Sequence, residues 1–94
     1  MTIAEAKQLR IVDYLASLGY HPQSVTSKQY WYLSPLRNER TPSFKVNDRL
    51  NEWYDFGAAT GGDLVELGKH LYQTDSVSEV LACIGRHENA APIQ

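Results

Sequence analysis

The sequence predicts a small α+β domain: one helix at its start, a small antiparallel sheet of three strands, and two helices at its end. Apolar residues recur at helical spacing in both end segments, whereas the aromatic middle segment alternates in short runs between prolines and polar turns. Ninety-four residues are enough for one modest hydrophobic core. We therefore expect residues 1–94 to form a single domain.

The first helix is predicted to begin at Thr2 and to end before Gly19. Thr2 and Glu5 have the spacing of a capping box, in which each side chain satisfies a free backbone N–H of the first turn. Apolar residues then recur at helical spacing, at Ile11, Leu15 and Leu18. Glycine is the usual residue just past a helix end, and the polar residues 21–29 that follow are expected to form a loop.

Three short strands are predicted in the aromatic middle of the chain. They cover residues 30–33, 42–47 and 52–56, where aromatic and β-branched residues gather or alternate with polar ones. Residues 47–51 join the last two strands as a hairpin. If Phe44 and Val46 point to the core, Lys45 between them points to solvent.

The last part of the chain predicts a loop and two helices. Residues 57–62 contain three glycines and are expected to be a flexible loop. A second helix follows, with an apolar stripe at Leu64, Leu67 and Leu71. Ser76 and Glu79 form another capping box before a third helix with apolar residues at Val77, Val80, Leu81 and Ile84. Residues 88–94 are expected to fray.

Composition excludes several classes of protein. No apolar run approaches the ~20 residues that a transmembrane helix needs, and charges interrupt any signal peptide in the first twenty residues. The single cysteine, Cys83, cannot form an internal disulfide, so we expect a reducing, cytoplasmic location. The net charge is −2, but residues 28–49 hold five basic and two acidic side chains, net +3. This basic segment is either a binding strip or a solvated surface.

A longer pattern links the middle segment to a known family. Residues 34–44 read Ser-Pro-Leu-Arg-Asn-Glu-Arg-Thr-Pro-Ser-Phe, followed by Trp-Tyr-Asp-Phe-Gly-Ala at 53–58 and Gly-Gly-Asp at 61–63. This arrangement resembles the N-terminal zinc-ribbon domain of bacterial DNA primases. The family pattern is Cys-Pro-x-His-x-Glu-x-Thr-Pro-Ser-Phe, an aromatic hairpin with Cys-x-x-Cys, and Gly-Asp at the start of a helix. The resemblance spans roughly residues 8–85 and implies a zinc-ribbon-like hairpin.

The four zinc-ligand positions of that pattern carry other residues here. They fall on Ser34, Arg37, Asp55 and Ala58, where the family has Cys, His, Cys and Cys. Structural zinc takes thiolate and imidazole ligands, and of these four residues only Asp55 could bind it. We therefore expect a degenerate copy that folds without zinc or any other cofactor. Arg37 and Asp55 are expected to face one another as an ion pair where the family has its metal.

The resemblance also implies a function. In the primase family this domain recognises single-stranded template, so we expect single-stranded DNA to bind here in replication or mobilisation of DNA. The candidate binding residues are Lys28, Arg40, Lys45, Tyr32 and Tyr54. The sequence has no Asp-x-Asp, the carboxylate motif of the primase catalytic domain. It therefore predicts a binding module and no enzyme, either part of a longer primase-like protein or a stand-alone relative of the kind mobile elements carry.

The alternative is a protein-interaction module that does not contact DNA. Its partner would be a primase catalytic domain, a helicase or a transfer protein. The acidic total charge and the lost zinc ligands favour this alternative, whereas the basic strip and the interleaved aromatic residues favour DNA binding. No membrane partner is expected.

Overall fold

The computed structural model describes residues 1–36 and 40–90, and within them the chain forms four helices and five strands. The helices are α1 (Ile3–Lys7), α2 (Ile11–Ser17), α3 (Leu64–Leu71) and α4 (Val77–Ala90). The strands are β1 (Ser24–Thr26), β2 (Gln29–Tyr32), β3 (Phe44–Asn47), β4 (Glu52–Asp55) and β5 (Thr60–Gly62). The predicted α+β class is confirmed.

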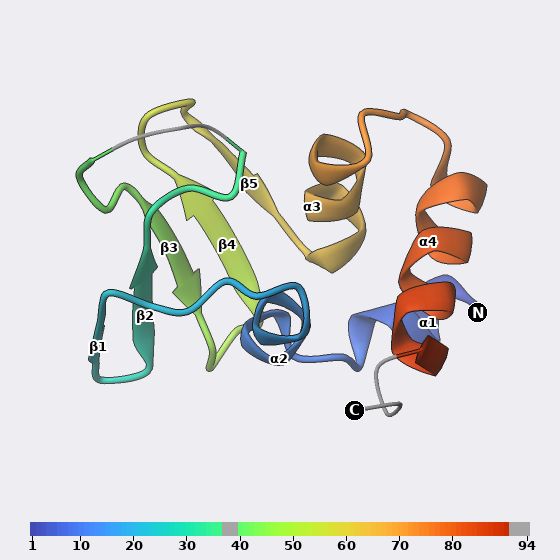
Figure 1. Ribbon diagram of the computed structural model, residues 1–94, viewed down its shortest axis with the longest axis horizontal. Coiled ribbons are helices and arrows are strands. Elements are labelled where there is room, and N and C mark those ends of the chain that lie inside the picture. The colour runs from blue at the N-terminus through green and yellow to red at the C-terminus, as the bar shows by residue number, and fades with distance from the viewer. Residues whose placement is uncertain (37–39, 91–94) are drawn as a thin grey trace.

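The five strands form one antiparallel sheet in which each strand pairs with its neighbour in sequence, in the order β1-β2-β3-β4-β5. The sheet occupies one side of the molecule, and α1, α3 and α4 lie together on the other (Figure 1). Strand β5 leads directly into α3 (Figure 1). One face of the sheet packs against the core, and the other face is open to solvent.

The three predicted strands are present, with their ends shifted by one or two residues. Phe44 and Val46 are fully buried, as their alternation predicts, and Lys45 lies on the opposite face. The hairpin between β3 and β4 pairs Asn47 with Glu52. Two strands were missed, because β1 and β5 lie in segments that the sequence predicts as loops.

Each missed strand lacks the usual sequence pattern for a physical reason. Strand β1 is exposed along its whole length, so no apolar alternation marks it. Strand β5 is rich in glycine because its backbone passes very close to β4: a Cβ on Gly61 would lie 2.8 Å from the Tyr54 ring and would also overlap the Trp53 carbonyl. Glycine therefore marks a close approach of two strands here.

The N-terminal segment forms two helices where the sequence predicts one. Asn51, in the β3–β4 turn, inserts its side chain between them: its Oδ1 accepts from the Ile11 N–H at 2.9 Å. Its Nδ2 donates to the carbonyls of Leu9 at 2.8 Å and Lys7 at 3.3 Å. The break thus uses backbone groups that one continuous helix would pair within itself. The apolar periodicity does not reveal it, because both helices face the same core.

The remaining helix ends follow local chemistry. Helix α2 stops before Gly19, which has φ +95°, and Asp63 caps α3 by accepting from the Glu66 N–H at 2.9 Å. Helix α4 extends to Ala90, the fraying expected for residues 88–94 stays a prediction, and residues 91–94 lie outside the described residues. No helix in the described ranges is long and apolar enough to span a membrane.

The core lies between the inner face of the sheet and the helices. Aromatic rings dominate the sheet side, where Phe44 stacks on Trp53 at 5.3 Å and meets Tyr32 edge-on at 6.0 Å. The Trp53 indole N–H donates to the Asp63 carbonyl at 2.8 Å, which ties β4 to the start of α3. The helices contribute buried aliphatic side chains, among them Ile11, Leu15, Leu64, Leu67, Val80 and Ile84.

We predict that Asn51→Ala lowers the free energy of unfolding by about 1–3 kcal/mol. The substitution leaves the Ile11 N–H and two carbonyls without the partners that the amide provides. Asn51 also has φ +55°, so Asn51→Gly is the matched control that removes the hydrogen bonds without backbone strain. Urea unfolding of both variants tests this. Wild-type stability for Asn51→Gly would show that the amide does not hold the hairpin against the helices.

Candidate nucleic-acid interface

Three of the four positions aligned with zinc ligands meet in one hydrogen-bonded cluster, in which Ser34 and Asp55 are buried and Ala58 is exposed. Ser34 and Asp55 are 5% and 0% exposed, and the Ser34 hydroxyl donates to Asp55 Oδ2 at 2.9 Å. The other oxygen, Asp55 Oδ1, accepts from the N–H groups of Gly57 at 2.9 Å and Ala58 at 3.2 Å. The Leu36 N–H donates to the Ser34 hydroxyl oxygen at 3.1 Å. We call this arrangement the Ser34–Asp55 link.

The residues of this link do not fit a structural zinc ion. Ala58 offers only a methyl group, and the hydroxyl of Ser34 is a weak ligand that already hydrogen-bonds the carboxylate. In the described part of the chain, no group of three or more His, Cys, Asp or Glu residues is placed to hold a metal. Arg37, the fourth position, lies outside the described residues, and its ion pair with Asp55 stays a prediction.

The outer face of the sheet carries an aromatic cluster around one lysine. Trp31, Lys45 and Tyr54 are consecutive partners across β2, β3 and β4. The ammonium of Lys45 lies 5.8 Å from the Trp31 ring centroid and 5.7 Å from that of Phe56, within cation–π range. Phe56 stacks on Trp31 at 5.8 Å and meets Tyr54 edge-on at 4.8 Å. We call these four residues the aromatic platform.

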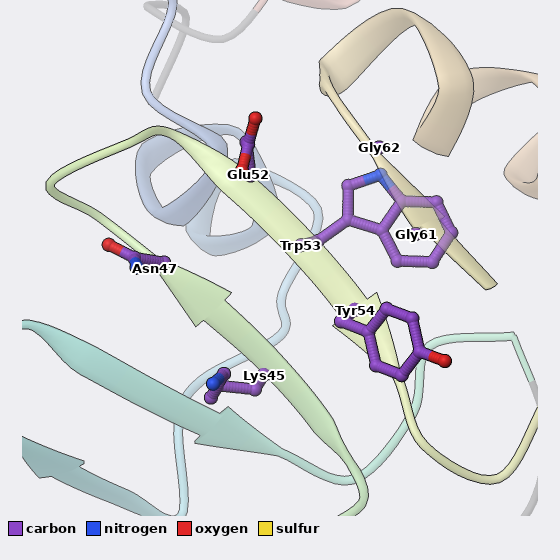
Figure 2. A pocket seen from close by; sticks show the side chains of 7 residues that line it. All are labelled: Lys45, Asn47, Glu52, Trp53, Tyr54, Gly61 and Gly62. Atoms are coloured by element: carbon purple, nitrogen blue, oxygen red, sulfur yellow. The ribbon is translucent and has the colours of Figure 1, made fainter. Parts of the chain in front are cut away.

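A groove of about 380 Å³ lies beside this platform. It runs over β3, β4 and β5 and is lined by Lys45, Asn47, Glu52, Trp53, Tyr54, Gly61 and Gly62. Lys45 and Tyr54 extend from neighbouring strands on its near side, whereas the Trp53 ring points toward α3 (Figure 2). Since Gly61 has no side chain, Tyr54 can lie close to β5. The groove therefore combines an aromatic ring, an ammonium, an amide and a carboxylate.

The structure brings together two of the predicted binding residues, Lys45 and Tyr54. It contradicts the expected exposure of Tyr32, which is only 1% exposed. Because strand residues alternate between faces, Tyr32 shares the core face with its partner Phe44, and its neighbour Trp31 takes the outer face. Burial raises the pKa of Tyr32 to about 12.

The other two predicted residues lie near opposite ends of β3. Lys28 is in the turn before β2, where its carbonyl accepts from the Asp48 N–H at 3.0 Å, just past the end of β3. Arg40 is exposed and precedes the start of β3 by four residues. The three basic side chains are thus spread along the sheet.

Sequence reasoning missed Trp31, Phe56 and Glu52 as surface residues of this face, and it did not include Asn47 among the binding residues. The available signal was strict alternation from buried Phe44: residues paired with Lys45 or Asn47 must share their face. This alternation assigns faces on β2 and β4 only when their register against β3 is known, and that register depends on the connecting turns. The sequence leaves that register open for the adjacent aromatic residues of β2.

Comparison with known proteins gives three consistent matches. The model of the CHC2 zinc finger family matches residues 4–92. A DNA primase of Lactococcus lactis subsp. lactis (strain IL1403) is 34% identical over 73 residues, which is 78% of this chain and 11% of that protein. The crystal structure of the Aquifex aeolicus primase (zinc binding and RNA polymerase domains) matches with a TM-score of 0.69 at 26% identity. That match covers 92% of this chain and 21% of the primase chain, and it falls on the zinc-binding domain.

We predict that Asp55→Ala destabilises the fold more than Ser34→Ala does. Removing the carboxylate takes the acceptor from the Gly57 N–H and the Ser34 hydroxyl, and leaves the Ala58 N–H with only the backbone carbonyl of residue 55, so we expect a cost of about 1–3 kcal/mol for each group left unpaired. Ser34→Ala removes the donor to Asp55 and the acceptor of the Leu36 N–H, but the carboxylate keeps its two N–H donors, so we expect a cost of about 1 kcal/mol. Urea unfolding at neutral pH measures both. Equal stability of Asp55→Ala and wild type would contradict a structural role for the link.

Proposed function

The chain belongs to the CHC2 zinc finger family, and from this we propose that it is a metal-free module that binds single-stranded DNA on the outer face of its sheet. The aromatic platform is the observation that carries the proposal. Tyr54 and Phe56 are 38% and 54% exposed, and the ammonium of Lys45 lies over the rings of Phe56 and Trp31. Exposed rings beside a cation are the combination that single-stranded nucleic acids bind.

Unpaired bases suit this surface better than a duplex does. A base in a duplex has both faces covered by its neighbours, whereas an unpaired base can stack on an exposed ring, worth about 1–3 kcal/mol for each base. Lys45 then lies where a backbone phosphate flanks the stacked base. Lys28 and Arg40 lie near opposite ends of β3. They extend the path along which basic side chains can neutralise the phosphates of a DNA strand.

The protein's charge limits the affinity. Its net charge is −2, and few basic groups accompany the platform. Each phosphate neutralised on a single strand contributes a slope of about −0.7 to the dependence of log K on log salt. We therefore infer modest affinity that falls with salt.

The Ser34–Asp55 link supports the metal-free state. In the family a zinc ion joins these two segments, and here a buried carboxylate joins them through hydrogen bonds. The matches support a primase-like role in DNA replication or mobilisation. They cover only a small part of each primase, and no Asp-x-Asp occurs in the sequence, so we assign binding and no polymerisation to this chain. Its partner would be a primase catalytic domain, a helicase or a transfer protein.

The DNA-binding proposal is tested by fluorescence anisotropy with a labelled thymidine oligonucleotide at low and moderate salt. We predict that Tyr54→Ala weakens binding about tenfold, because one stacking surface is lost. Tyr20→Ala is the matched control, since Tyr20 is also 38% exposed and lies in the loop after α2. Absence of binding by the folded wild-type chain at low salt would instead favour the protein-interaction module.

The charge contribution is tested separately. We predict that Arg40→Ala with Lys45→Ala weakens binding and flattens the salt dependence. Lys69→Ala with Arg86→Ala, on α3 and α4, removes the same two charges away from the sheet and is the control. Equal effects of the two pairs would mean that only total charge matters.

For the metal-free state, we predict that a strong chelator leaves the thermal unfolding midpoint unchanged. Where structural zinc is present it provides a large part of the folding free energy, so its removal unfolds the domain. Elemental analysis of the purified protein is the second measurement. Stoichiometric zinc, or unfolding by the chelator, would refute this part of the proposal.

A further inference from the structure

The groove beside Tyr54 has a polar end formed by Asn47 and Glu52. These two residues are partners across β3 and β4, so both start on the outer face of the sheet, and both line the groove. Lys45 and Tyr54 form the next pair on the same face of β3 and β4, two residues away from Asn47 and Glu52. Two residues of a strand span about 7 Å, so the backbones of the two pairs are about one nucleotide apart along the sheet.

Glu52 has no structural partner that explains its charge. It is exposed, and no cation pairs with it within residues 1–36 and 40–90. The nearby acidic residue Asp48 is different, because Arg10 binds it at 2.7 Å. A carboxylate in this position repels phosphate, yet it accepts hydrogen bonds from the N–H groups of a base. Its chemistry therefore points to contact with a base edge.

Asn47 complements this carboxylate. Its Oδ1 accepts from the Leu50 N–H at 3.2 Å, which fixes the amide so that its NH₂ group is the part available for a ligand. The polar end of the groove thus offers two acceptor oxygens from β4 and one amide donor from β3. Guanine has the matching edge, with adjacent donors at N2 and N1 followed by an acceptor at O6. Cytosine and adenine offer one amino group beside an acceptor, and thymine offers one N–H between two carbonyls.

Resting on the proposed function, we propose that this groove holds one base stacked on Tyr54 and selects guanine. Glu52 accepts from N1–H and N2–H, Asn47 donates to O6, and Lys45 neutralises the flanking phosphate. A bidentate bond to a carboxylate is charge-assisted and directional, so it discriminates among bases that stack equally well. The aromatic platform provides affinity, and Glu52 provides base preference.

The test compares thymidine oligonucleotides that carry one central dG, dA, dC or dT, by fluorescence anisotropy. We expect the dG strand to bind about tenfold more tightly than the all-thymidine strand. A strand with hypoxanthine in place of guanine lacks the N2 amino group and should lose most of this preference. Equal affinity for all strands would overturn the guanine assignment and leave the proposed function intact, whereas absence of binding to every strand would overturn both.

Substitution of Glu52 is the second part of the experiment. In Glu52→Gln the preference for dG should fall to about twofold or less, while the all-thymidine strand binds at least as tightly because a negative charge is gone. Glu79→Gln, on the exposed side of α4, makes the same change of charge away from the sheet and should keep the preference. Circular dichroism confirms that both variants fold. A full dG preference in Glu52→Gln would refute the role given to Glu52.

Discussion

The buried carboxylate of Asp55 joins the segment after β2 to the turn after β4. It accepts from Ser34, which follows β2, and from the N–H groups of Gly57 and Ala58 in the turn after β4. Such a group is costly to bury unless its oxygens are bonded, so its donors must stay in place. Phe56 lies inside that turn, and its own N–H donates to the Ser43 carbonyl at 2.8 Å. The position of Phe56 against Trp31, and with it the aromatic platform, therefore depends on this link.

The pleat of the sheet decides which aromatic residues are core and which are surface. Phe44 and Trp53 stack inside the domain, whereas Trp31 and Tyr54 lie on the outer face around Lys45. A shift of β3 by one residue would bury Lys45 and expose Phe44, and a shift of β4 would bury Tyr54 and expose Trp53. The stability of the core thus fixes the composition of the binding face, because the same alternation determines both. A change of register would therefore alter the core packing and the outer face together.

The sequence was informative wherever local chemistry decides the structure. Alternation around Phe44, the glycine after α2 and the apolar stripes of the last two helices predicted elements that are present. It was uninformative where a distant side chain decides. The break between α1 and α2 depends on Asn51, more than forty residues away from Lys7 and Leu9. The outer position of Trp31 depends on strand register, and the strand at Gly61 depends on its close approach to Tyr54.

Lys45 and Glu52 place opposite charges on the outer face of the sheet, and the two charges have different effects on a bound polyanion. Total charge, at −2, argues against strong attraction to a polyanion, so recognition must come from short-range contacts. Lys45 is held over two rings and lies in one row of side chains, and Glu52 lies in the next. A carboxylate lowers the affinity for phosphate wherever it stands, but beside a stacking ring it also distinguishes one base edge from another. Under the proposed function, the outer face would trade affinity for selectivity, as expected of a domain that inspects a strand and does not hold it permanently.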